Sequence, residues 1–95
     1  MKESSIIKQI RAHLEKKYKA VCFKHYGSIY SEVGVSDLIC CLNGKYLALE
    51  VKTSKGKATP KQLHFIYSIK QAGGIAGVVR SIEDVEVLIK QNLST

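Results

Sequence analysis

Hydrophobic residues recur along this chain at two spacings, one typical of helices and the other of strands. Ile6, Ile7, Ile10 and Leu14 fall on one helical stripe, which predicts a helix over residues 5–17. Shorter apolar runs bounded by turn residues predict strands. The remaining predicted elements are strands at residues 20–26, 36–42, 45–52 and 75–79, and helices at residues 60–72 and 82–92.

Two short signals mark where these elements begin and turn. The pair Asn43-Gly44 stands between two apolar runs and is typical of a two-residue type I′ turn, so it predicts a β-hairpin. Thr59 as N-cap, Pro60 at the first helical position and Gln62 at the third predict the start of a helix. The inward side chains predicted for the second and third helices are Leu63, Ile66 and Ile69, and Ile82, Val85, Leu88 and Ile89.

The predicted order of elements is helix, three strands, helix, strand, helix. A helix that crosses between the third and fourth strands makes these two strands parallel, whereas the hairpin is antiparallel. The expected fold class is therefore α/β, a small mixed β-sheet flanked by helices. At 95 residues, we expect a single domain over residues 1–95.

Charge adds a functional indication to this architecture. Lysine and arginine outnumber aspartate and glutamate by 15 to 8, for a net charge of +7, which favours a polyanionic partner such as nucleic acid. The chain has no apolar run long enough to span a membrane, and its first residues lack the apolar segment of a signal peptide. We therefore expect an intracellular, cytoplasmic protein with no membrane partner.

The cysteines are better explained as packing residues than as metal ligands. Cys22, Cys40 and Cys41 form no C-x-x-C pair, and the three histidines stand at no familiar zinc spacing. We expect small, buried, reduced thiols.

The hairpin register brings three ionisable groups together. With Asn43-Gly44 as the loop, Leu42 pairs with Lys45, and counting outward places Asp37 opposite Glu50. Lys52 follows Glu50 by two residues and therefore lies on the same face of the sheet. A slip of one residue would move Asp37 to the opposite face, so the prediction depends on the turn.

Two opposed carboxylates repel each other unless a proton, a cation or a metal ion lies between them. Two carboxylates and a backbone carbonyl suit a hard cation such as Mg²⁺, and a lysine beside it could activate water or hold a phosphate oxygen. The structural alternative is an ion pair of Lys52 with Glu50 or Asp37 at a frayed edge. The combination of opposed acids, lysine and basic surroundings favours a site.

Neighbouring residues each have a functional and a structural interpretation. Glu3 either points toward the core side of the first helix or only complements its dipole. Gln62 either contacts phosphate or the site water, or serves only in the capping box. The basic residues near the site form either a solvated loop or a contact surface for nucleic acid; they are Lys45, Lys55, Lys57 and Lys61. Gly56 would let the backbone come close to a phosphate.

An aspartate at the start of one hairpin strand and Glu-x-Lys at the end of the next resemble the PD-(D/E)xK nuclease superfamily. More narrowly, the order of motifs resembles a VRR-NUC domain of the stand-alone phage and bacterial type. These motifs are GVSDL at 34–38, Asn43-Gly44, EVK at 50–52, KGK at 55–57, Gln62, and GGIAGVVRSIEDV at 73–85. The resemblance covers nearly the whole chain and implies a restriction-endonuclease-like core.

The resemblance also implies roles for individual residues. Asp37, Glu50 and the Val51 carbonyl correspond to metal ligands, for Mg²⁺ or Mn²⁺, and Lys52 to the catalytic lysine. Glu3 and Gln62 match the acid of the family's first helix and the glutamine of its second. Ser36 stands where the family usually has proline, and we expect it, with the basic loop, on the nucleic-acid surface.

Together these observations predict a metal-dependent endonuclease that hydrolyses phosphodiester bonds in DNA. A chain this small has little surface for reading sequence, so we expect structure-selective cleavage of branched DNA such as four-way (Holliday) junctions. Symmetric cleavage of such a junction needs two active sites and therefore a homodimer. The alternatives are a non-catalytic basic module that binds nucleic acid, and a nuclease for linear DNA, specific sequences or RNA.

Overall fold

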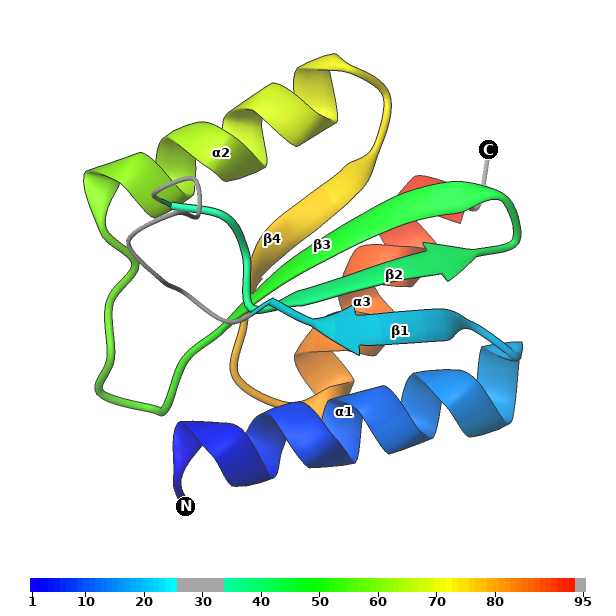
Figure 1. The fold of residues 1–95 in the computed structure, drawn as a ribbon, viewed down its shortest axis with the longest axis horizontal. Coiled ribbons are helices and arrows are strands. Elements are labelled where there is room, and N and C mark those ends of the chain that lie inside the picture. The colour runs from blue at the N-terminus through cyan, green and yellow to red at the C-terminus, as the bar shows by residue number, and fades with distance from the viewer. Residues whose placement is uncertain (26–33, 94–95) are drawn as a thin grey trace.

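The elements follow one another in the predicted order in the structure, a computed structural model that describes residues 1–25 and 34–93 (Figure 1). In these residues the chain forms three helices and four strands, which confirms the predicted α/β class. The helices are α1 (Glu3–Tyr18), α2 (Pro60–Gln71) and α3 (Ile82–Leu93). The strands are β1 (Val21–Lys24), β2 (Leu38–Leu42), β3 (Lys45–Val51) and β4 (Ile75–Val79).

The bounds of the first elements differ modestly from the prediction. Helix α1 begins at Glu3, two residues earlier than the apolar stripe indicates, and ends where Lys19 adopts left-handed backbone with φ of 58°. Strand β1 is shorter than predicted and ends at Lys24. The last residue of the predicted strand, Tyr26, and most of the predicted loop after it lie outside the described residues, which leave out residues 26–33.

The hairpin turn is the one that the sequence predicts. Asn43 and Gly44 both have positive φ, 51° and 78°, as a type I′ turn requires. Leu42 pairs with Lys45, and the register continues without slippage to the pair formed by Leu38 and Leu49. The register that the site prediction depends on is therefore confirmed.

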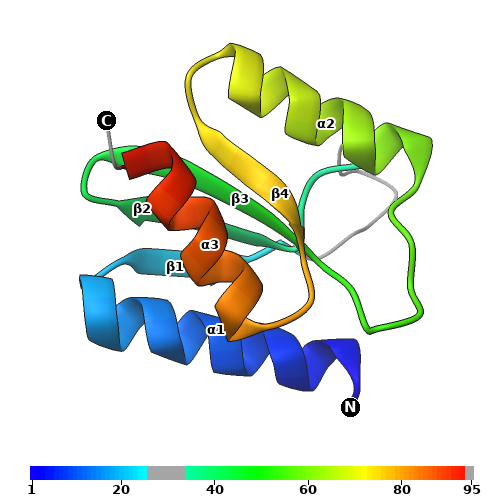
Figure 2. The ribbon, with the colours of Figure 1, turned by 180° about the vertical axis from the view of Figure 1, so that it is seen from behind.

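The sheet has the strand order β1-β2-β3-β4, antiparallel except for the parallel pair of β3 and β4. Helices α1 and α3 cover one face, and α2 covers part of the other, as the two opposite views show (Figures 1 and 2). The main core lies between the sheet and the first pair of helices. Its most buried members are Ile10, Leu14, Leu38, Leu42, Leu47, Leu49, Val51, Val79, Val85 and Ile89.

A smaller core lies under α2 and consists of Ile39, Ala48, Ile66 and Ala76, with Phe65, Ile69 and Val78 packed against it. The prediction that Leu63 faces the sheet is wrong, because 52% of its surface is exposed. Helix α2 packs mainly on β4 and β3, so only a narrow stripe of its side chains faces the sheet, and Leu63 in its first turn lies outside this stripe.

Two of the three cysteines behave as predicted. Cys22 and Cys40 are buried opposite each other on β1 and β2, whereas Cys41 is exposed on the face that α2 leaves open. No helix in the described part of the chain is both long and apolar enough to cross a membrane.

Candidate active site

The end of the hairpin away from its turn brings Asp37 beside Glu50. The ladder of β2 and β3 runs to Leu38 and Leu49, and the Val51 backbone N–H then donates a hydrogen bond of 3.1 Å to Oδ2 of Asp37. Residues 47, 49 and 51 of β3 face the main core, so Glu50 faces the α2 side by the alternation of the strand. The Asp37 carboxylate is thus held by a backbone hydrogen bond, and the Glu50 carboxylate projects from β3 on the same face of the sheet.

Glu50 is the most unusual ionisable residue of the described chain. Only 1% of it is exposed, and neither carboxylate oxygen has a hydrogen-bond partner among the described residues. Burial and, after it, the neighbouring Asp37 carboxyl raise the pKa of Glu50, Lys52 lowers it, and the net result is a pKa of about 8. The carboxyl group is therefore largely protonated at neutral pH unless a cation replaces the proton.

Lys52 completes the cluster on the same face. Its Nζ lies 3.5 Å from Oε2 of Glu50, and 14% of its side chain is exposed. Its backbone N–H donates to the Val79 carbonyl at 3.0 Å, which extends the pairing with β4 by one residue and fixes where Lys52 leaves the sheet. The predicted ion pair exists, but it leaves both Glu50 oxygens without a hydrogen bond.

A divalent cation fits the chemistry of this donor set. Carboxylate oxygens and a backbone carbonyl are hard ligands, and the Glu50 oxygens lack protein partners in the described chain. The described residues contain no group of three or more His, Cys, Asp or Glu side chains that could hold a metal ion. Two carboxylates alone would leave coordination positions for water and for substrate oxygens.

Gln62 is engaged in the capping box. Its Oε1 accepts a hydrogen bond of 2.8 Å from the Thr59 backbone N–H, and its own N–H donates to the Thr59 side chain at 3.2 Å. The start of α2 nevertheless lies against the segment before β2, which also contains Asp37. A Cβ on Gly34, which has φ of +90°, would lie 2.7 Å from the Lys61 carbonyl oxygen. The capping interpretation of Gln62 is confirmed, and a second role for it at the site stays a prediction.

Glu3 approaches the same end of the sheet from the other face. It is the half-buried first residue of α1, whose N-terminal turn borders the loop after β3. A cavity of about 360 Å³ lies at this junction, lined by Met1, Ile6, Gln9, Thr53, Ser54, Arg80, Ser81, Ile82 and Glu83. Within the described residues, no hydrogen bond or ion pair joins Glu3 to the carboxylates on the α2 side.

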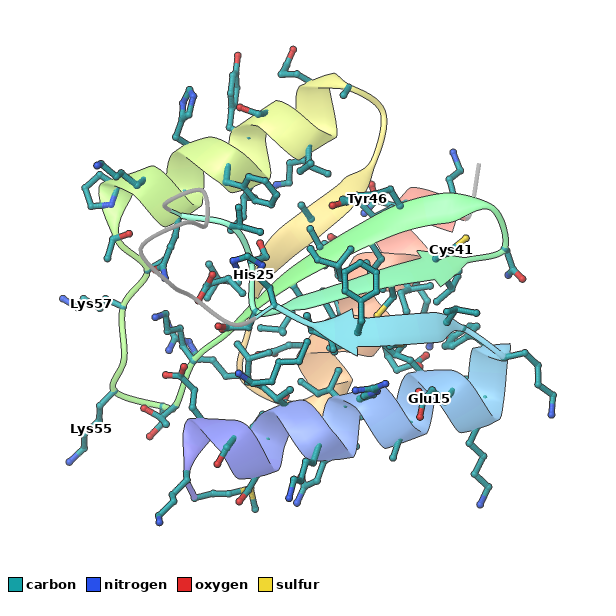
Figure 3. All side chains as sticks on the ribbon, in the orientation of Figure 1. Glu15, His25, Cys41, Tyr46, Lys55 and Lys57 are labelled. Atoms are coloured by element: carbon teal, nitrogen blue, oxygen red, sulfur yellow. The ribbon has the colours of Figure 1, made fainter. Side chains whose placement is uncertain are left out.

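The predicted nucleic-acid surface divides into an exposed and a buried part. Lys55, Lys57 and Lys61 are exposed, and Figure 3 shows Lys55 and Lys57 extending from the loop after β3. Ser36, expected beside them, is only 1% exposed, and its Oγ has no hydrogen-bond partner within residues 1–25 and 34–93. The segment before β2 packs against the start of α2 at Gly34 and Lys61, so Ser36 is buried, and its contact with nucleic acid stays a prediction.

Two residues near the site escaped sequence reasoning. His25 donates its backbone N–H to the Asp37 carbonyl at 2.7 Å, and the β1–β2 register puts it on the α2 face, at the end of β1 (Figure 3). Arg80 follows β4 and bonds to the loop after β3. No turn motif in the sequence fixes the register of β1 against β2. No sequence signal links Arg80 to Thr53 and Gly56, which lie more than twenty positions earlier in the chain.

Comparison with solved structures points to one kind of domain. The chain superposes on a structure titled "VRR_NUC domain" with a TM-score of 0.75 at 27% identity, covering 93% of this chain and 94% of that one. A second structure, "VRR_NUC domain protein", gives a TM-score of 0.74 at 18% identity over 99% of this chain and 89% of that one. No family model and no curated protein sequence matches the chain.

Proposed function

We propose that this chain, whose fold is similar to that of structures titled as VRR_NUC domains, is a nuclease, and more narrowly a Mg²⁺- or Mn²⁺-dependent endonuclease that hydrolyses phosphodiester bonds in DNA. The observation that carries this proposal is the environment of Glu50. Burying a carboxyl group without hydrogen bonds costs stability, and a second carboxylate beside it adds to that cost. A purely structural role does not account for such an arrangement.

Asp37, Glu50 and the Val51 carbonyl are the groups that would hold the cation. A bound divalent ion polarises a scissile phosphate and lowers the pKa of a water molecule. The Val51 N–H keeps the Asp37 carboxylate in place by its hydrogen bond of 3.1 Å. As a ligand, Glu50 would have to be ionised, so its raised pKa would make cation binding weaker at low pH.

Lys52 is the group that would act on the attacking water or hold a phosphate oxygen. Its ammonium is only partly exposed and lies 3.5 Å from the Glu50 carboxylate, so its position is tied to the carboxylate pair. Gln62 and Glu3 would support the site from the start of α2 and of α1. The Gln62 amide uses its oxygen in the capping box and keeps its N–H donors for a phosphate.

The substrate that fits this chain best is branched DNA, such as a four-way junction. Lys55, Lys57 and Lys61, with Gly56 between the first two, offer phosphate contacts that carry no sequence information. The net charge of +7 supports the same mode of binding. Paired cleavage of a two-fold junction requires two copies of the site, and we therefore propose a homodimer.

The test offers a four-way junction, a linear duplex and RNA to the wild type and to Asp37→Asn, with Mg²⁺, Mn²⁺ or EDTA. We expect cleavage of the junction only with metal, and a loss of more than about 100-fold in kcat for Asp37→Asn, because even outer-shell changes at metal sites cost 10–100-fold. Lys52→Met should lose on the order of 100-fold or more through general acid–base chemistry.

The matched controls are Glu83→Gln and Lys90→Met, which remove exposed charges of the same signs from α3. Both should cleave as the wild type does. Cleavage in EDTA, or undiminished cleavage by Asp37→Asn, would overturn the mechanism. Binding of all three substrates without cleavage would instead support a non-catalytic module, and preference for linear DNA or RNA would overturn the junction assignment.

A further inference from the structure

The loop between β3 and α2 is held from outside by one arginine. The Nη1 group of Arg80 donates hydrogen bonds to the backbone carbonyls of Thr53, at 2.5 Å, and Gly56, at 2.7 Å. These two carbonyls flank Ser54 and Lys55, so the guanidinium group links the two ends of the turn. The Gly56 N–H also donates to the Thr53 carbonyl at 3.2 Å, which gives the turn its own internal hydrogen bond.

Arg80 is itself positioned by the elements on either side of it. It follows β4 directly, and its backbone N–H donates to Oδ2 of Asp84 at 2.8 Å in the first turn of α3. The preceding residue, Val79, accepts the backbone hydrogen bond from Lys52 at 3.0 Å. The parallel pairing of β3 and β4 thus brings the start of the loop and Arg80 side by side.

The turn held by Arg80 packs on the Lys52 side chain. A Cβ added to Gly56 would meet Lys52 Cδ at 3.5 Å and Lys52 Cβ at 3.6 Å, so the turn lies against the stem of this lysine. On its outer side the turn presents Lys55 and Lys57 to solvent (Figure 3). One hydrogen-bonded turn therefore touches the lysine of the candidate active site, contains Lys55 and directly precedes Lys57, which are two of the three lysines of the predicted DNA surface.

We propose that Arg80 is a positioning residue for DNA binding, which acts by holding the 53–56 turn rather than by contacting DNA. This inference rests on the proposed function and assigns a role to a residue outside the cluster of carboxylates. An exposed lysine on a free loop loses conformational entropy when it binds phosphate. Fixing the backbone at both ends of the turn lowers that entropic cost for Lys55, which lies within the turn, and for Lys57, which directly follows it.

The experiment measures binding of a fluorescent four-way junction in EDTA, as a function of salt. Arg80→Gln removes one charge, and Arg11→Gln, which removes an exposed charge from α1, is its matched control. We expect Kd to rise about tenfold for Arg80→Gln and less than about twofold for Arg11→Gln. If two lysine contacts weaken together, the slope of log K against log salt falls by more than the ~0.9 expected for one lost contact.

A double-mutant cycle separates positioning from direct contact. In a Lys55→Gln/Lys57→Gln background, Arg80→Gln should raise Kd less than about twofold, because the groups it positions are already gone. The same tenfold rise in that background would mean that Arg80 binds DNA directly and would overturn the proposal. If Arg80→Gln does not unfold cooperatively, Arg80→Lys takes its place in the same comparisons.

A third measurement needs neither DNA nor metal, so it distinguishes failure of this inference from failure of the proposed nuclease activity. The Gly56 amide is protected by its bond to Thr53, and we expect its hydrogen exchange to accelerate at least about tenfold in Arg80→Gln. Exchange unchanged from the wild type would show that Arg80 does not hold the turn.

Discussion

Glu50 is the residue at which stability and the proposed function oppose each other in this chain. Its carboxyl group lies in the sheet surface with 1% exposure, and its hydrogen-bonding capacity is unused within the described chain. Its neighbours are another acid and a lysine, which act on its pKa in opposite directions. The cost of this burial is largest when the group is ionised and no cation is bound.

The pH dependence of stability follows from the raised pKa of Glu50. A carboxyl group with a folded pKa of about 8 and an ordinary value of 4.5 keeps its proton in the folded state while the unfolded chain loses it. The stability of the metal-free protein therefore falls as pH rises between these two values. Glu50→Gln removes this dependence and should be more stable than the wild type near pH 9, on the order of 3 kcal/mol.

Urea unfolding of the metal-free proteins at about pH 5 and about pH 9 measures this effect. Near pH 5, where the wild-type carboxyl is protonated, the two proteins should differ by less than about 1 kcal/mol. Glu83→Gln serves as a control for the loss of an exposed carboxylate on α3. A wild type that is more stable near pH 9 than near pH 5 would contradict the assignment of a buried, unpartnered acid.

The elements around the site are held in place by a few contacts between segments distant in sequence. The start of α2 is fixed against the segment before β2 at Gly34 and Lys61, and α1 is fixed to α3 through Glu86. Each of these contacts can be disturbed by one substitution outside the hairpin. Such substitutions test the packing between elements without changing Asp37, Glu50 or Lys52.

Gly34→Ala tests the contact between the start of α2 and the segment before β2. The added Cβ would lie 2.7 Å from the Lys61 carbonyl oxygen, and the φ of +90° is strained for alanine. We expect a loss of about 2–4 kcal/mol in the free energy of unfolding, from strain and from displacement of backbone. Gly44→Ala, with φ of +78° and no atom within 4 Å, has strain alone and should lose about 1 kcal/mol.

Glu86 joins α1 to α3 through three side chains. It accepts hydrogen bonds from Lys17 at 2.8 Å, Tyr18 at 2.8 Å and the His13 ring at 2.7 Å. Burial on its own raises the pKa of Glu86, but the bonds from Lys17, His13 and Tyr18 outweigh it and lower the pKa to about 2. The predictions for His13 concerned zinc only, so this network was not foreseen.

Because the folded pKa of Glu86 is depressed, its contribution to stability is present above the ordinary value of 4.5 and is lost as pH falls toward 2. Glu86→Gln should destabilise the protein at neutral pH by on the order of 2–3 kcal/mol, with a difference that shrinks below about pH 4. Thermal unfolding across pH measures this. Glu83→Gln, on the exposed side of α3, should change stability by less than about 0.5 kcal/mol.

At the scale of the whole molecule, the proposed activity requires more than one chain. A four-way junction has two equivalent cleavage positions, and one copy of the chain has one carboxylate pair. We expect light scattering at micromolar concentration to give twice the monomer mass of 10.5 kDa. A strictly monomeric mass with and without junction DNA would contradict the homodimer, while leaving the chemistry of Asp37, Glu50 and Lys52 to its own test.

The sequence by itself determined the features that depend on neighbours along the chain. Asn43-Gly44 set the turn, the turn set the register, and the period of two put Asp37, Glu50 and Lys52 on one face. Thr59 and Gln62 likewise marked the start of α2, and their capping box forms as predicted. These inferences succeed because turn geometry and side-chain alternation are local properties of the backbone.

Only the tertiary structure decided how each of these groups meets its surroundings. Contacts between segments far apart in sequence account for the hydrogen bonds of Arg80 and the Glu86 network. They also account for the burial of Glu50 and Ser36 and the exposure of Leu63. Desolvation and hydrogen-bond partners depend on which elements pack together, and one sequence does not specify that packing position by position. The sequence thus located the candidate chemistry, and packing set its electrostatics and its exposure.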